Sequence, residues 1–362
     1  MLRKGTFIPM KTKIQDMTSG SPGRLIILFA IPLMLGNICQ QLYTMVDTMV
    51  VGQVAGVEAL AALGAVDFLM WVVTGISTGL TQGFSIQLSQ YYGAKDFENL
   101  RKSLAHSYRL TAFIAIGVFI LSQSFASLVL TGLHTPSNII GMSLLYLRII
   151  FCGIPATAAY NMFASALRAM GNSKTPLTAM IIASVLNVSL DILFVAGLGW
   201  GVAGAAIATV IAQSFSAVYC FLILRRIDIV HLTRADFMPA SGMNARLMKL
   251  GIPVVFQNII IGVGGLVVQY VINGYGFLFV AGFTATNKLY GLLEMAAISY
   301  GYAIVTYVGQ NLGAEKIDRI RKGVRSSMLL SLLTSLIISA AMFLFGKNIL
   351  SLFISGEPQQ TQ

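Results

Sequence analysis

The sequence predicts an all-α integral membrane protein, and three observations support this fold class. The chain has 362 residues, of which 56% are hydrophobic and 10% are charged, whereas soluble domains average about 25% charged residues. Its mean hydropathy is +0.79. Apolar runs of the roughly 20 residues that a helical crossing needs recur along the whole chain. The N-terminal segment up to Gly23 is polar and basic and has no cleavable-signal pattern.

Nine membrane-spanning helices are expected from these apolar runs. They cover residues 25–50, 59–88, 104–130, 140–167, 177–197, 202–224, 250–273, 279–308 and 327–354.

Lysine and arginine gather in alternate loops. Twenty of the 24 lie in residues 1–24, 95–102, 168–174, 225–249 and 316–325. Because basic loops face the cytoplasm, we expect a cytoplasmic N-terminus in the cell membrane. The net charge of +11 therefore reports topology, and we expect no nucleic-acid partner. The three cysteines lie in apolar runs, where packing is a better explanation than a disulfide or a metal site.

The chain contains an internal repeat. The segment QYYGAKDFENLRKS from Gln90 resembles QNLGAEKIDRIRKG from Gln310, an offset of 220, and Ile31–Pro32 matches Ile252–Pro253 at 221. Six spans separate the copies, so both have the same orientation and predict two lobes related by an axis along the membrane normal.

This repeat divides the chain into three parts. Residues 1–224 form a six-span N-terminal lobe, 225–249 a cytoplasmic linker, and 250–362 a partial C-terminal lobe of three spans. By its own duplication the chain requires twelve spans. Either it is truncated after the ninth span or it departs from its own duplication, and we expect the truncation.

Two acidic residues lie inside apolar spans. Asp47 follows Gln40 and Tyr43 on one face of the first span, and Asp191 follows Asn187 by one turn in the fifth. A buried carboxylate costs roughly 2.5–3.5 kcal/mol on insertion scales, so it marks a functional site by default. The alternative is that Asp47 reaches headgroup water. Both acids lie at a similar depth, where Thr209 could add a hydroxyl. Such oxygen ligands suit Na⁺ or H⁺.

Other polar groups have simpler explanations as well. Asn187 and Thr209 could form ordinary interhelical hydrogen bonds, and the same holds for Tyr146 and Asn161 in the fourth span. Pro32 removes a backbone donor from the first span and predicts a bend or hinge, although such prolines are common in membrane helices. No phosphate-binding loop and no H-E-x-x-H site occurs, so we expect no enzyme and no cofactor.

Four segments together resemble the MATE family of multidrug and toxin extrusion transporters. They are IPLMLGNICQQLYTMVDTMVVG, QYYGAKDFENLRKS, ALRAMGNSKTP and LNVSLDILFVAGLGWGVAGAAIAT. The resemblance implies twelve spans in two six-helix lobes, and exchange of organic cations or amphipathic drugs for H⁺ or Na⁺. We expect a monomer.

By resemblance to the DinF-like branch, four residues would form the cation site of the N-terminal lobe: Asp47, Asn187, Asp191 and Thr209. Gln40 and Asn161 would line the substrate cavity, with Tyr43 and Tyr146 as further candidates, and Pro32 would mark the bend of the first helix. The acid of the NorM-like branch in span 7 is missing here, where Gln257, Asn258 and Gln269 stand.

The implied mechanism is alternating access, in which two lobes rock about a central cavity. Two other functions stay open at this point. One is a flippase for lipid-linked saccharides. Such a protein would need several Arg or Lys side chains along the cavity to bind pyrophosphate, and Arg148 and Lys288 are few for that role. The other is an inactive truncated fragment.

Overall fold

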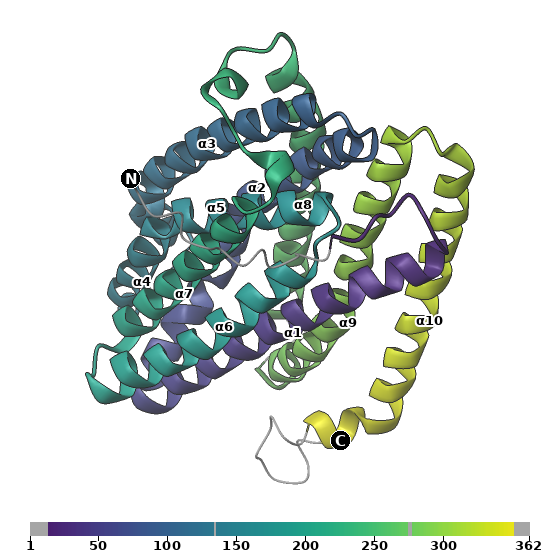
Figure 1. The fold of residues 1–362 in the computed structure, drawn as a ribbon. Helices are drawn as coiled ribbons and strands as arrows, with labels where there is room; N and C mark the ends of the chain where they lie inside the picture. The colour runs from purple at the N-terminus through teal and green to yellow at the C-terminus, as the bar shows by residue number, and fades with distance from the viewer. Residues whose placement is uncertain (1–13, 134, 274–276, 351–362) are drawn as a thin grey trace.

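Long helices joined by short turns make up the protein (Figure 1). The computed structural model describes residues 14–133, 135–273 and 277–350, and contains no strand within them. The helices are α1 (Pro22–Val54), α2 (Val57–Gly93), α3 (Phe97–Gly132), α4 (Ile140–Cys152), α5 (Ile154–Ala169), α6 (Lys174–Asp191), η1 (Ile192–Gly197), α7 (Gly201–Leu224), η2 (Asp228–Val230), η3 (Arg234–Phe237), α8 (Met243–Asn273), α9 (Phe277–Gly313) and α10 (Ile317–Leu350).

These helices lie where the sequence predicts spans. Among the described residues, seven helices are long and apolar enough to cross a membrane, and the pair α4–α5 adds an eighth if it counts as one bent span. The remaining expected span, 279–308, falls within α9. Residues 351–362, the end of the expected third unit, lie outside the described residues. The division into six plus three spans stays a prediction.

The fourth expected span is broken rather than continuous. Its two halves, α4 and α5, meet at an angle of 46° at Gly153. Pro155 stands in the first turn of α5, where its missing N–H costs no helical hydrogen bond. A Cβ on Gly153 would approach Cγ2 of Val210 on α7 to 2.7 Å. The break therefore lets α4–α5 pack closely against α7.

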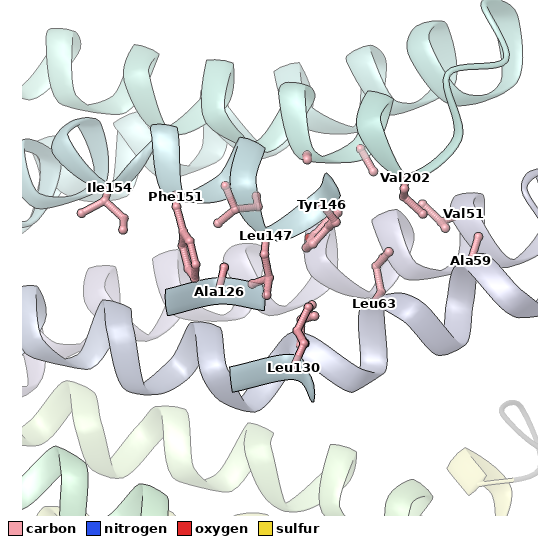
Figure 2. Packing of buried hydrophobic residues seen from close by; sticks show 14 of the residues in the cluster. Val51, Ala59, Leu63, Ala126, Leu130, Tyr146, Leu147, Phe151, Ile154 and Val202 are labelled. Carbon is pink, nitrogen blue, oxygen red and sulfur yellow. The ribbon is translucent and has the colours of Figure 1, made fainter. Parts of the chain in front are cut away.

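An apolar core at one end of the helix bundle packs α1 to α4 and α7 together (Figure 2). Tyr146 lies in this core beside Leu63, Leu147 and Val202. A second core lies under the opposite ends of the helices, around Phe84, Leu104 and Leu167. These cores fix the helices that carry the polar residues.

The helix boundaries repeat with the offset found in the sequence. The first residues of α2 and α9, Val57 and Phe277, are counterparts at this offset, and so are their last residues, Gly93 and Gly313. The turns that follow also match, because Lys95 and Glu315 both adopt φ of 58°. The two segments are therefore copies in backbone conformation as well as in sequence.

The copies contact each other through equivalent residues. A Cβ on Gly93 would collide with the carbonyl of Gln310, and a Cβ on Gly313 would collide with the carbonyl of Gln90. Ser89 lies against its own counterpart Gly309. Such reciprocal contacts are those of a twofold axis that runs between α2 and α9. We call this close contact of the two helix ends the interlobe seam.

Two asparagines extend this symmetry deeper into the molecule. Asn37 Nδ2 on α1 donates to Ser299 Oγ on α9 at 3.1 Å. Its counterpart in the second copy, Asn258 on α8, donates through Nδ2 to the carbonyl of Gly75 on α2, also at 3.1 Å. In Figure 1, α1 accordingly runs beside α9.

The expected linker 225–249 holds more helix than the sequence predicts. It contains η2 and η3, and α8 already begins at Met243. Asp236 in η3 accepts hydrogen bonds from the N–H and the hydroxyl of Thr233, at 2.7 and 2.8 Å. Its Oδ1 also lies 3.7 Å from Nε of Arg101 on α3. The linker is thus an ordered strip packed on α3.

Candidate cation site

Two buried carboxyl groups lie on α1 and α6. Asp47 is 5% exposed and Asp191 is fully buried. The two helices pack along each other, and Ser184 Oγ on α6 donates to the carbonyl of Cys39 on α1 at 3.4 Å. The two acids therefore lie on adjacent helices that pack against each other, and their shared site stays a prediction.

Asn187 and Thr209, two further residues of the predicted site, contact each other. Asn187 is fully buried one turn before Asp191. Its Nδ2 donates to Thr209 Oγ1 on α7 at 3.4 Å. Three helices, α1, α6 and α7, thus contribute to one polar cluster, and it is the long-range packing of α6 on both neighbours that assembles it.

The cluster is rich in acceptors that lack a donor. Asp47 Oδ1, both carboxylate oxygens of Asp191 and Asn187 Oδ1 are buried without a hydrogen-bond partner among the described groups. An unpaired buried oxygen costs about 1–3 kcal/mol, and more when it is charged. A set of oxygens with surplus negative charge is satisfied by a proton or a small cation, and both acids cannot stay ionised side by side without one.

A short π-helix follows Asp191 directly. Residues 192–197 form η1. The N–H of Leu198, the residue that follows it, donates to the carbonyl of Leu193 at 2.8 Å. The ring of Phe194 stacks on Trp200 at 5.1 Å, and Gly204 of α7 fits closely against Phe194. π-Bulges are rare and frequent at functional sites. Here the bulge ends α6 at the acid and turns the chain back into α7.

Gln213 is a site neighbour that the sequence reasoning missed. Its Nε2 donates to the hydroxyl of Tyr43 at 3.3 Å, and its Oε1 is buried without a partner among the described groups. Tyr43 is buried one turn before Asp47. Gln213 is four residues after Thr209 and thus on the same face of α7, so this spacing was the available signal.

The other predicted cavity residues differ in burial and in hydrogen-bond partners, and their role stays a prediction. Gln40 is exposed. Asn161 on α5 donates to Thr78 Oγ1 on α2 at 3.2 Å. Tyr146 is 5% exposed within the apolar core. Pro32 is buried inside α1, which continues as one helix through it.

The donor set decides which ion the cluster suits. It offers carboxylate, amide and hydroxyl oxygens, and the described residues include no group of three His, Cys, Asp or Glu side chains that could hold a metal. Hard oxygen ligands fit Na⁺ or H⁺ better than a transition metal. Asp47, Asn187, Asp191 and Thr209 would hold such an ion.

Comparison with known proteins places this geometry in a family. The model of the MatE family matches residues 32–193 and 253–358, together well over half of the chain. The chain belongs to the MatE family. The two matched segments begin at Pro32 and Pro253, which the internal repeat aligns with each other. In this MatE protein the acid pair therefore lies within the first matched segment.

Relatives and solved structures agree with this assignment. "Probable multidrug resistance protein YpnP" of Bacillus subtilis is 31% identical over 95% of this chain and 77% of its own length. "Probable multidrug resistance protein YoeA" of the same organism is 28% identical over 94% and 75%. A MOP superfamily transporter from Pyrococcus furiosus has the same fold, with a TM-score of 0.90 and 24% identity over 97% of this chain and 78% of that one. The names of both Bacillus subtilis relatives describe multidrug resistance, and neither name is that of an enzyme.

Proposed function

We propose that this MatE protein exports organic cations or amphipathic compounds in exchange for H⁺ or Na⁺, and that the ion binds at Asp47, Asn187, Asp191 and Thr209. The observation that carries the proposal is the set of buried carboxylate and amide oxygens without a donor. The names of the relatives in Bacillus subtilis, which describe multidrug resistance, support drug-like compounds as the substrate class.

Ion binding would control which side of the protein opens. With an ion bound, the repulsion between the two carboxylates is relieved, and the pair stays buried between α1 and α6. Without the ion, two like charges face each other in a low-dielectric region, which favours hydration and separation of these helices. Moving one charge through 100 mV supplies about 2.3 kcal/mol. An ion gradient can therefore drive export by alternating access.

The interlobe seam supports the rocking of two lobes. It closes the protein at the helix ends that carry the basic turns, and Asn37 is ten residues from Asp47 along α1, or about 15 Å. The ion site thus lies beyond the seam. The finer assignments belong to the same proposal: residues 1–224 as the first lobe, a cytoplasmic N-terminus in the cell membrane, a monomer, and the DinF-like branch, since the acids lie in the first lobe.

Export of a fluorescent organic cation tests the proposal. Vesicles that hold the chain receive an H⁺ gradient or a Na⁺ gradient separately, and efflux is followed by fluorescence. We expect Asp47→Asn to lower ion-driven efflux to background, because an amide can neither take up a proton nor supply the negative charge that binds Na⁺.

Asp228→Asn is the matched control, since this exposed linker residue loses the same charge far from the site. It should transport like the unchanged protein. Full ion-driven efflux by Asp47→Asn at equal expression would contradict the ion site, and the absence of efflux from the unchanged chain under both gradients would contradict the exporter.

A further inference from the structure

Residues 14–21, the N-terminal strap, run across the interlobe seam before α1 begins. Met17 in the strap is fully buried. Its N–H donates to Gln310 Oε1 at 3.0 Å, and its carbonyl accepts from Asn311 Nδ2 at 2.9 Å. Both partners lie at the end of α9, in the second repeat. The strap therefore joins the helix that follows it, α1, to the opposite copy.

Gln310 connects the strap to the first repeat as well. Its Nε2 donates to the carbonyl of Ala169 at the end of α5, at 2.8 Å. Next to it, the N–H of Gln15 donates to the carbonyl of Gly171 at 3.1 Å. Gly171 has φ of +89°, and a Cβ there would collide with the carbonyl of Gln15. Strap, α5 and α9 thus meet in one buried junction.

Two cations of the second repeat hold the strap carbonyls. Arg319 on α10 donates through Nη1 to the carbonyl of Gly20 at 2.9 Å and through Nε to Asn311 Oδ1 at 3.0 Å. Lys316 Nζ donates to the carbonyl of Thr18 at 2.9 Å. Hydrogen bonds from charged donors are about twice as strong as neutral ones. The second repeat therefore binds the strap largely through the strap's backbone carbonyls.

Asp16 fixes the shape of the strap. Its Oδ1 accepts from the N–H and the hydroxyl of Thr18, at 2.8 and 2.7 Å, and its Oδ2 accepts from Ser19 Oγ at 3.0 Å. Burial acts to raise the pKa of Asp16, but these hydrogen bonds and the charge of Lys316 together lower it below the ordinary value of 3.8. The carboxylate is thus ionised at neutral pH and keeps the turn.

The linker before α8 is the counterpart of the strap. The helices that follow the two segments begin at Pro22 and Met243, which are equivalent positions of the repeat. In the linker, Arg109 Nη1 of α3 donates to the carbonyl of Phe237 at 3.0 Å. In the strap, Arg319 Nη1 of α10 likewise donates to a backbone carbonyl, that of Gly20. The linker is covalently joined to both lobes through α7 and α8, whereas the strap holds the second repeat by noncovalent contacts alone.

We propose that the N-terminal strap is a releasable latch that keeps the interlobe seam shut. The lobes can part at this end only when Met17 and Gly20 leave Gln310, Asn311 and Arg319. The strength of the strap contacts then sets how often the seam opens. This holds whatever solute the protein carries.

Labelling of a cysteine in the seam tests the latch. Cys39, Cys152 and Cys220 are replaced by serine, and Ser89, fully buried against Gly309, is replaced by cysteine. The purified chain in lipid nanodiscs is treated with a water-soluble maleimide, so that both faces are accessible. We expect Arg319→Ala to raise the labelling rate of this cysteine by roughly tenfold, which corresponds to about 1.4 kcal/mol in the opening equilibrium.

Lys322→Ala is the matched control, because Lys322 lies exposed on the same helix, three residues on, and it should label at the original rate. Gln310→Leu removes the amide contacts with little change in volume and should raise the rate as Arg319→Ala does. Thermal melting establishes that each variant is folded. Unchanged labelling in the folded Arg319→Ala and Gln310→Leu proteins would overturn the latch, as would an equal rise in Lys322→Ala.

Discussion

At the scale of single residues, the proposed ion site depends on polar side chains whose helical spacing places them on one face. Asp191 and Asn187 are one turn apart on α6, and both are fully buried. Helical spacing predicts their common face, and the unusual cost of a carboxylate in an apolar span identifies Asp47 as their partner. Gln213 escaped prediction because a single glutamine in a membrane helix has many structural explanations.

Thr209 offers a prediction at this scale. Its hydroxyl accepts the hydrogen bond of Asn187 Nδ2 and so fixes the orientation of the Asn187 amide. Thr209→Val keeps the shape but leaves the amide without its acceptor, at about 1–2 kcal/mol. We expect the half-saturating concentration of the coupling ion in the efflux assay to rise by about tenfold.

Thr209→Ser retains the hydroxyl and serves as the rescue variant. It should restore the ion dependence of the unchanged protein. Equal ion affinity in Thr209→Val and Thr209→Ser would remove Thr209 from the site.

At the scale of helices, two interruptions position the site, and the sequence shows only one of them. Gly153 and Pro155 were visible signals for the break between α4 and α5, yet the continuous apolar run from 140 to 167 favoured one helix. The π-helix after Asp191 has no comparable signal, because residues 192–197 read as an ordinary apolar helix end. Its register depends on packing against α7, including Phe194 against Gly204.

Gly153 provides a prediction at the scale of helices. A methyl group there would meet Val210, the residue after Thr209, so Gly153→Ala should push α7 away from the break. Overpacking typically costs about 1–3 kcal/mol. We expect a lower melting temperature in detergent, measured by circular dichroism.

Gly141→Ala in the neighbouring helix α4 is the control, because no atom lies within 4 Å of the added methyl group. It should melt like the unchanged protein or slightly higher, since alanine favours helix. Equal melting temperatures of the two variants would show that the close approach of Gly153 to Val210 does not contribute to stability.

At the scale of the whole molecule, the duplication organises the fold, and the sequence predicts it well. The offset read from two basic turns recurs in the bounds of α2 and α9 and in the reciprocal contacts of Gly93 and Gly313. The strap could not be predicted in the same way. It has no periodicity, and its partners near the opposite end of the chain bind mainly backbone carbonyls, which every sequence has.

In the proposed function, Asp47 and Asp191 share one exchangeable cation inside the membrane. Labelling with a hydrophobic carbodiimide, which reacts with protonated carboxyl groups in apolar surroundings, tests this sharing most directly when peptide mass spectrometry locates the adduct. We predict an adduct on Asp47 or Asp191 that declines when the pH rises or when Na⁺ saturates the site, and that is lost or moved when either residue becomes asparagine. The shared site would be contradicted if neither acid were labelled, or if the extent of labelling changed with neither pH nor Na⁺ concentration.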